Sequence, residues 1–232
     1  MGVLHLVRHG QASFGSDDYD VLSDAGHQQA RVLGAWLAAH GPAPATVVHG
    51  GLRRHRETWA GTLEGAGWAG VPDALVASDW DEFDFQAVLA RYSGLTDDLL
   101  ADDVDRREFQ AYFERATGHW IGHTEEGEAG YDESFSAFVE RSRRALRAAA
   151  RLDGPVVAVT SGGVIAALAA VLLSSGDPEA APDLPTVGTL WERLNTVVVN
   201  TSVTRVLLGA TGARLLTFNE HPHLPRELRT YR

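Results

Sequence analysis

The segment Arg8-His9-Gly10 directly follows a short apolar run at residues 3–7, which is typical of a buried strand. In α/β proteins, ligands bind at the carboxyl ends of such strands. An arginine guanidinium offers a rigid fork of donors to phosphate oxygens, and a histidine can attack, accept a proton or hold a metal. These residue types in this place predict an anion site with a reactive imidazole at the end of the first strand.

Two later segments contain groups that such a site could use. Residues 53–56 include three arginines at the start of an expected helix, where free backbone N–H groups also favour an anion; the alternative is a solvated helix face. Glu82 lies among Trp80, Phe83 and Phe85. Because aromatic surroundings raise the pKa of a carboxyl group, Glu82 could act as a proton donor near neutral pH.

The turn Ser161-Gly162-Gly163 joins an expected strand to an expected helix and could form a backbone nest for an anion; the alternative is an ordinary tight turn. Ser161 could instead be the nucleophile of a serine esterase, followed in chain order by Asp183 and either His221 or His223. A nucleophile elbow needs glycine two residues before the serine, however, and Val159 stands there. The esterase would also leave the first segment without a role.

The composition restricts the class of ligand. The chain has 232 residues, a formal net charge of -11 and no cysteine. Without a basic stripe, this charge argues against binding to nucleic acid or an anionic membrane, but a locally positive pocket could still take a small phosphorylated substrate. The lack of cysteine excludes disulfides, thiolate metal sites and cysteine nucleophiles. The first residues do not resemble a signal peptide and the longest apolar run, residues 164–173, is too short to span a membrane, so we expect a cytoplasmic protein.

Three further patterns have ordinary explanations. The pairs His221-x-His223 and His119-x-x-x-His123 have the spacing of metal ligands, but no third ligand is near, so we expect surface or packing histidines. The glycine pattern at 65, 67 and 70 follows an expected helix rather than a strand, so its match to a dinucleotide-binding motif is interpreted as chance. The sequence therefore predicts neither a metal nor a cofactor.

The order of expected elements predicts an α/β fold. Apolar runs bounded by turn residues predict strands, and three-and-four spacing predicts helices. The expected strands are residues 3–7, 45–49, 75–77, 156–160, 196–200, 203–208 and 214–218. The expected helices are residues 22–40, 52–63, 106–117, 132–151 and 164–174. With no repeat and no clear linker, residues 1–232 are predicted to form one domain.

Residues from about 85 to 130 are acidic and irregular apart from the expected helix at 106–117. We interpret this segment as a helical insertion over the carboxyl edge of the sheet. It is expected to be a solvated excursion; the alternative is a lid that shapes substrate choice.

Five ordered segments resemble those of the histidine phosphatase superfamily, often called the phosphoglycerate mutase-like family. They cover most of the chain and are specific when taken together. The segments are Leu6-Val7-Arg8-His9-Gly10-Gln11-Ala12 and residues 22–30, 50–58, 80–85 and 218–224. The resemblance implies a three-layer α/β/α sandwich with a mostly parallel central sheet.

The resemblance also implies a mechanism. His9 would attack phosphorus in line and form a phosphohistidine, with its other ring N–H held by an acceptor such as a backbone carbonyl. Arg8 and Arg54 would clamp the transferring oxygens, and Glu82 would protonate the leaving alcohol and then activate water. Ser161 and Gly162 would add phosphate contacts. The guanidinium groups supply the positive charge, so no metal is expected.

Two positions depart from the family pattern. The second catalytic histidine of the family, in a His-Gly pair, corresponds to Ser161-Gly162, and the asparagine after the opening motif is missing near Gly15. A serine hydroxyl donates one neutral hydrogen bond and brings no charge, and loss of one preorganised donor typically costs about 10²–10³ in turnover. We therefore expect a slow enzyme or a rearranged pocket.

The predicted activity is hydrolysis of phosphomonoesters, on a small phosphorylated metabolite or a phosphoprotein. One alternative is a phosphoglycerate mutase-like phosphotransferase, but no segment identifies the basic contacts needed to retain a bisphosphorylated effector. Another is a low-activity or non-catalytic phosphate-binding protein, against which the joint presence of Arg8, His9, Arg54 and Glu82 weighs. The sequence does not indicate an oligomeric state.

Overall fold

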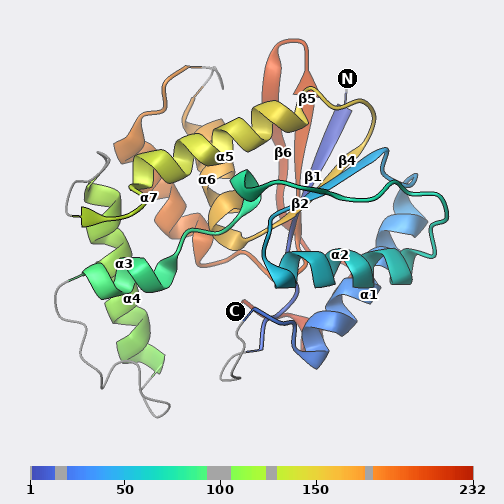
Figure 1. The fold of residues 1–232 in the computed structure, drawn as a ribbon, viewed down its shortest axis with the longest axis horizontal. Helices are drawn as coiled ribbons and strands as arrows, with labels where there is room; N and C mark the ends of the chain where they lie inside the picture. The colour runs from blue at the N-terminus through green and yellow to red at the C-terminus, as the bar shows by residue number, and fades with distance from the viewer. Residues whose placement is uncertain (1, 14–19, 93–105, 124–129, 176–179, 232) are drawn as a thin grey trace.

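Six strands form one mixed sheet in this computed structural model, which describes residues 2–13, 20–92, 106–123, 130–175 and 180–231 (Figure 1). The strand order is β3-β2-β4-β1-β5-β6. The first four strands in this order are parallel, whereas β5 and β6 run antiparallel to their neighbours. The strands are β1 (Gly2–Arg8), β2 (Thr46–His49), β3 (Leu75–Val76), β4 (Val156–Thr160), β5 (Val203–Gly209) and β6 (Gly212–Glu220).

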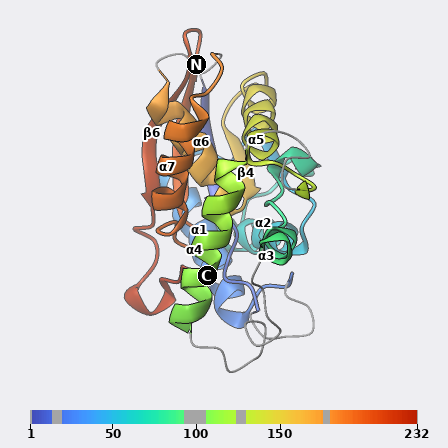
Figure 2. The same ribbon diagram turned by 90° about the vertical axis from the view of Figure 1, so that its left-hand side faces the viewer.

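Helices cover both faces of this sheet. Within the described ranges the α-helices are α1 (Asp24–His40), α2 (Arg53–Ala66), α3 (Phe85–Arg91), α4 (Arg106–Gly122), α5 (Phe135–Ala149), α6 (Gly162–Ser174) and α7 (Leu184–Asn195), with short 3-10 turns at Ser78–Trp80 and Arg226–Leu228. Figure 1 shows α1 and α2 on one side of the sheet and α5, α6 and α7 on the other. The helices α3 and α4 pack together, and α4 reaches α5 and α7 (Figure 2). This is the α/β sandwich that the sequence predicts.

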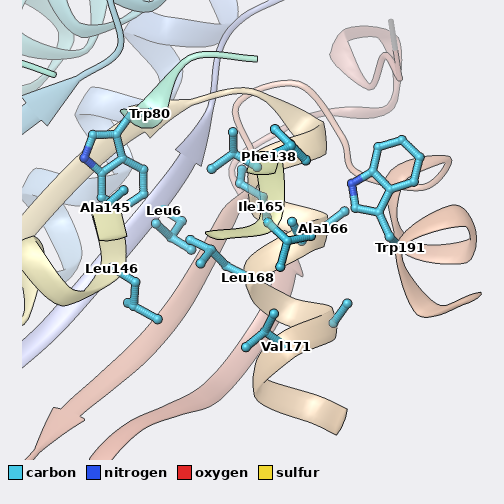
Figure 3. Packing of buried hydrophobic residues seen from close by; sticks show 14 of the residues in the cluster. Leu6, Trp80, Phe138, Ala145, Leu146, Ile165, Ala166, Leu168, Val171 and Trp191 are labelled. Atoms are coloured by element: carbon cyan, nitrogen blue, oxygen red, sulfur yellow. The ribbon is translucent and has the colours of Figure 1, made fainter. Parts of the chain in front are cut away.

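The pleat of each strand divides its side chains between two cores, because successive residues point to opposite faces. Leu4 and Leu6 of β1 join the large core under α5 and α6, whereas Val7 joins the core under α1 and α2. In the large core, Leu6 lies near Trp80 and Leu168 (Figure 3). A strand buried on both faces is expected only in the middle of a sheet covered by two helical layers.

The segment after β1 is fixed by a close approach to the first turn of α1. A Cβ on Gly10 would lie 2.6 Å from the carbonyl oxygen of Gly26, and one on Gly26 would lie 2.2 Å from that of Gln11. Ser23 caps α1 by accepting the Gly26 N–H. The glycine pair therefore lets α1 begin directly beside the end of β1.

Parts of the element assignment from sequence are wrong. Residues 196–200 form no strand, and α7 occupies residues 184–195, where no helix was expected. Pro185 is tolerated because it stands in the first turn of α7, where a missing N–H breaks no helical hydrogen bond. Val198 and Val199 are buried as predicted for a strand, but the Val199 N–H donates to the Asn219 side chain at 2.8 Å instead of to a neighbouring strand.

Other boundaries differ by a few residues, and α3 was not predicted. Asp84 caps α3 by accepting the Ala87 N–H at 2.9 Å, inside the segment expected to be irregular. The helix α4 continues to Gly122, and α5 begins at Phe135 because Ser134 caps it. The acidic segment at residues 97–105 lies outside the described residues. Gly15, near which the family pattern has an asparagine, also lies outside them.

Candidate active site

Backbone hydrogen bonds hold His9 at the carboxyl end of the parallel strands. Arg8 lies beside Thr160 in the register of β1 and β4, and the His9 N–H donates to the Thr160 carbonyl oxygen at 2.9 Å. On the other side, the His9 carbonyl oxygen accepts the Asn200 side-chain N–H at 3.1 Å and the Thr201 N–H at 3.3 Å. His9 is thus fixed between β4 and the segment that leads into β5.

The His9 imidazole is held in one tautomer. Its Nδ1 lies 2.7 Å from the Gly10 carbonyl oxygen, and because a carbonyl only accepts, the proton is on Nδ1. Burial lowers the pKa of His9 well below its usual 6.5, and the charges of Arg54 and Arg8 lower it further. The imidazole is therefore neutral, with the lone pair of Nε2 available to attack an electrophile. The backbone acceptor expected for the other ring nitrogen is present.

Two arginines flank this imidazole from different elements. Arg54, on the first turn of α2, donates to the Asp20 carboxylate at 2.8 Å. Its carbonyl oxygen accepts the hydroxyl of Thr58, which in turn accepts the Gly10 N–H at 2.9 Å, so α2 is connected directly to the end of β1. Arg8, the last residue of β1, donates to the backbone carbonyl oxygens of Val198 and Tyr231.

Glu82 is a partly buried carboxyl group within reach of both arginine charges. Burial raises the pKa of Glu82 above its usual 4.5, and the Gly163 N–H and the charges of Arg54 and Arg8 partly oppose this shift. One carboxyl oxygen accepts the Gly163 N–H at 2.9 Å. The adjacent Phe83 ring stacks on Trp120 at a centroid distance of 4.7 Å. Burial thus shifts the pKa of Glu82 in the direction that the sequence predicts.

The loop before Glu82 is clamped by an arginine of α5. Arg141 forms a two-point ion pair with Glu133, at 2.7 and 2.9 Å. The same guanidinium donates to the Asp81 carbonyl oxygen at 2.7 Å. Arg141 therefore fixes the backbone immediately before the buried acid.

The turn Ser161-Gly162-Gly163 begins α6 and fits closely around two of these groups. A Cβ on Gly162 would lie 3.4 Å from Arg8 Nε, and a Cβ on Gly163 would lie 2.2 Å from a Glu82 carboxyl oxygen. The N–H of Gly163, expected to bind an anion, instead holds Glu82. The site residues predicted from sequence, Arg8, His9, Arg54, Glu82, Ser161 and Gly162, are therefore brought together at the carboxyl edge of the sheet.

Sequence reasoning missed His55. Its Nε2 lies 2.7 Å from the Ser161 hydroxyl oxygen, and its ring centroid lies 5.7 Å from that of His9. Burial lowers the pKa of His55 well below its usual 6.5, and Arg54 and His49 lower it further, so this ring is also neutral. The available signal was helical spacing: the buried residues of α2 include His55, Thr58, Trp59 and Thr62, and residues at such intervals share one helix face.

Other combinations suggested by the sequence are not assembled. Ser161 pairs with His55, and Asp183 accepts a hydrogen bond from Thr186. His221 bonds to the Asn219 carbonyl oxygen and His223 contacts the Thr201 hydroxyl, so the esterase triad is not assembled among the described residues. The rings of His119 and His123 stack on one another at 4.0 Å. No group of three or more metal-ligating side chains occurs in the part of the chain that the structure describes.

At its carboxyl edge, the mixed sheet between helical layers carries a neutral imidazole, two guanidinium groups and a partly buried carboxyl group. This arrangement defines an α/β protein with a candidate anion site. The chain belongs to the histidine phosphatase superfamily (branch 1), whose family model matches residues 4–221. A search of curated proteins gives no significant match.

Solved structures with the same fold include phosphatases and a mutase. A phosphoserine phosphatase mutant from Entamoeba histolytica, in complex with phosphoserine, has a TM-score of 0.61 at 18% identity, over 97% of this chain and 100% of that one. A mycobacterial glucosyl-3-phosphoglycerate phosphatase with VO3 has a TM-score of 0.61 at 26% identity, over 94% and 99%. A phosphoglycerate mutase from Bacillus anthracis has a TM-score of 0.60 at 18% identity, over 95% and 94%.

Among the helices in the described ranges, none has the length and apolar character needed to cross a membrane.

Proposed function

We propose that this protein is a phosphomonoesterase that works without a metal, through a phosphohistidine intermediate on His9. The observation that carries the proposal is the state of His9. Its imidazole is buried and neutral, Nδ1 is held by the Gly10 carbonyl oxygen, and Nε2 is left as the nucleophile beside two guanidinium groups. A fixed tautomer and a nearby positive charge are what attack on a phosphate monoester dianion requires.

In the first step, Nε2 of His9 forms a bond to phosphorus while the bond to the ester oxygen breaks. Arg8 and Arg54 stabilise the negative charge on the equatorial oxygens. Glu82 gives its proton to the leaving alkoxide, and burial favours the protonated form because it raises the pKa of this group. The products of this step are the free alcohol and a phosphohistidine.

In the second step, the Glu82 carboxylate takes a proton from water, and the water oxygen attacks phosphorus as the bond to His9 breaks. Glu82 is thereby protonated again and inorganic phosphate is released, so atoms and charges balance over the cycle. The guanidinium groups supply positive charge throughout, so we propose that neither a metal nor another cofactor takes part.

The relatives support a small phosphorylated substrate. The 26% identical mycobacterial structure is that of a glucosyl-3-phosphoglycerate phosphatase, and the Entamoeba phosphatase mutant was solved with phosphoserine. We propose hydrolysis of a small phosphorylated metabolite or a phosphoprotein in the cytoplasm. The alternative is phosphoryl transfer of the mutase type, since a mutase shares the fold.

We further propose that Ser161 stands where the family has its second catalytic histidine. It follows Thr160, the last residue of β4, and Thr160 pairs with Arg8, so Ser161 and His9 directly follow the ends of two neighbouring strands. Its hydroxyl lies 2.7 Å from His55 Nε2, which supports the rearranged pocket expected from sequence. Turnover is expected to be slow.

The test is hydrolysis of p-nitrophenyl phosphate by the folded protein in the presence of a chelator. We expect turnover that EDTA does not change and that His9→Ala and Arg54→Ala abolish. Phosphate binding without turnover would support the non-catalytic alternative. Turnover that depends on an added phosphoryl acceptor would support a mutase.

A further inference from the structure

His55 is a buried titratable side chain that the proposed mechanism does not use. It is fully shielded from solvent on the inner face of α2, between Arg54 and Thr58 along the same helix. Its Nε2 meets the Ser161 hydroxyl oxygen at 2.7 Å, and both groups lie beside His9. A buried imidazole and a hydroxyl are thus paired at the place where the phosphoryl group would be transferred.

The surroundings of His55 fit its ring closely. A Cβ on Gly50 would lie 2.4 Å from His55 Nδ1 and also 2.4 Å from Asp81 Oδ1, so only glycine leaves room for both groups. Asp81 is held in turn by the Gly51 N–H at 2.6 Å. The Asp81 carboxylate lies 3.9 Å from His55 Nδ1. The ring is therefore confined between this loop and Ser161, which limits its choice of orientation.

We propose that His55 is a positioning residue that directs the Ser161 hydroxyl toward the transferring phosphoryl group, so that the two side chains together replace one histidine donor. This inference rests on the function proposed above. The role of His55 follows from its contact with Ser161, not from its place in the arginine-rich segment.

The direction of the hydrogen bond follows from the charge of the substrate. A phosphoryl oxygen beside Ser161 carries negative charge and accepts hydrogen bonds, so the serine hydrogen must point toward it. In the proposed arrangement the lone pairs of the serine oxygen then face His55, and Nε2 carries the hydrogen and donates it across the 2.7 Å contact. A serine without this partner could rotate its hydrogen away, whereas the imidazole keeps the hydroxyl oriented before substrate binds.

A double-mutant cycle tests the coupling. The variants are His55→Ala, Ser161→Ala and the combination, assayed with p-nitrophenyl phosphate. We expect Ser161→Ala to lower kcat by about 10²-fold, the effect of losing one preorganised donor, with a KM change below about threefold. Because His55 acts through Ser161, the double variant should be no slower than the slower single variant, whereas independent effects would multiply.

Two controls separate this role from a general loss of structure. His40→Ala removes an exposed histidine, and Ser142→Ala removes a fully buried hydroxyl that bonds only within α5. Both should keep the wild-type kcat. Thermal unfolding of every variant identifies any that does not fold.

A second set of variants keeps the hydrogen-bond donor at position 55 or moves it to position 161. Their kcat values are informative even if His55→Ala does not fold. Gln at position 55 can place an N–H near the position of Nε2, whereas Leu cannot, so His55→Gln should keep most of the kcat that His55→Leu loses. Ser161→His alone should lower kcat, because His55 already fills the neighbouring space. Ser161→His combined with His55→Ala should recover activity, because one imidazole then replaces the pair.

The outcomes distinguish this inference from the proposed function. If the wild type hydrolyses the ester but the His55 and Ser161 effects multiply, or His55→Gln is as slow as His55→Leu, the positioning role is wrong and phosphatase activity stands. If the phosphoryl group is found on Ser161 in a base-labile form, the pair is a nucleophile and its base, and both proposals are wrong. If the folded wild type shows no turnover, the proposed function fails first.

Discussion

The hydroxyl oxygen of Ser161 and Nε2 of His55 lie 2.7 Å apart, although 106 residues separate them in the sequence. The contact joins the carboxyl end of β4 to the first turns of α2, two elements that also place His9 and Arg54. The site residues predicted from the sequence include one imidazole, that of His9, whereas the folded site also contains that of His55.

Gly50 and Gly51 offer a matched test of the space around His55. A Cβ at Gly50 would lie 2.4 Å from both His55 Nδ1 and Asp81 Oδ1, but at Gly51 its nearest contact is an ordinary 3.4 Å. Gly50→Ala should therefore lower kcat about tenfold or more. The new methyl group would displace His55, which then no longer positions the Ser161 hydroxyl as a donor. Gly51→Ala should leave kcat unchanged. Equal kcat values for the two variants would contradict the tight fit.

Gly163→Ala should impair the proposed general acid, Glu82, without changing the chemical identity of that side chain. The new Cβ would lie 2.2 Å from a Glu82 carboxyl oxygen and push the carboxyl group from its place. We expect a loss of about 10² in kcat with an alkyl phosphate, whose poor leaving group needs a proton, and a much smaller loss with an aryl phosphate. Glu82→Gln should show the same dependence on leaving group. Gly122→Ala, where a Cβ would meet nothing within 4 Å, is the control.

If the loss in Gly163→Ala is the same for alkyl and aryl phosphates, the carboxyl group does not act as the acid. The position of Glu82 would then serve only the structure of the loop.

The two shifted pKa values predict an acidic activity optimum. His9 must be unprotonated to attack, and burial and the arginines lower its pKa well below 6.5, so kcat/KM should fall only as the pH drops far below that value. Glu82 must be protonated to donate, and burial raises its pKa above 4.5, so kcat/KM should fall as the pH rises through that raised value. The measurement is kcat/KM against pH, corrected for ionisation of the substrate. An acid limb at or above 6.5 would contradict the neutral, buried nucleophile.

Arg141 is predicted to stabilise the loop that carries the acid. Arg141→Ala removes the two-point pair with Glu133 and the hydrogen bond to the Asp81 carbonyl oxygen. The free energy of unfolding should fall by about 2 kcal/mol, as for lost hydrogen bonds to a charged group, and kcat should fall with it because Glu82 follows directly in the chain. Urea unfolding measures the first effect.

The matched control is Arg144→Ala, three residues further along α5. Arg144 is half exposed and pairs with Asp79 at 2.9 Å, and an exposed ion pair contributes at most about 1 kcal/mol. If Arg144→Ala lowers the free energy of unfolding as much as Arg141→Ala does, the contacts of Arg141 with Glu133 and the Asp81 carbonyl oxygen have no special role.

The sequence predicted the strands that carry the site because their apolar runs end sharply at polar residues. Thr160 and His49 end β4 and β2 as expected, and β1 runs one residue past its expected end, to Arg8. Parallel pairing then brings these carboxyl ends to one edge. The helix α7 was missed because prolines were interpreted as a loop signal, although Pro185 occupies a first-turn position that favours a helix.

The contact of His55 could not be predicted from local pattern. In the sequence it stands among arginines and suggests a solvated face, but the helix turns it inward and leaves Arg53 and Arg56 outside. Only the tertiary packing of α2 against β4 brings it to Ser161. Glu82 differs, because its aromatic neighbours in the sequence already indicated burial.

The most direct test of the account is to locate the phosphoryl group on the enzyme during turnover. The protein is mixed with p-nitrophenyl phosphate, quenched within its first turnovers in alkali, digested and mapped by mass spectrometry. The account predicts an acid-labile, base-stable phosphoryl group on His9, absent from His9→Ala and more abundant in a Glu82→Gln variant that cannot activate water. Turnover by the wild type with no phosphoryl group on His9, or with one on Ser161, would contradict it.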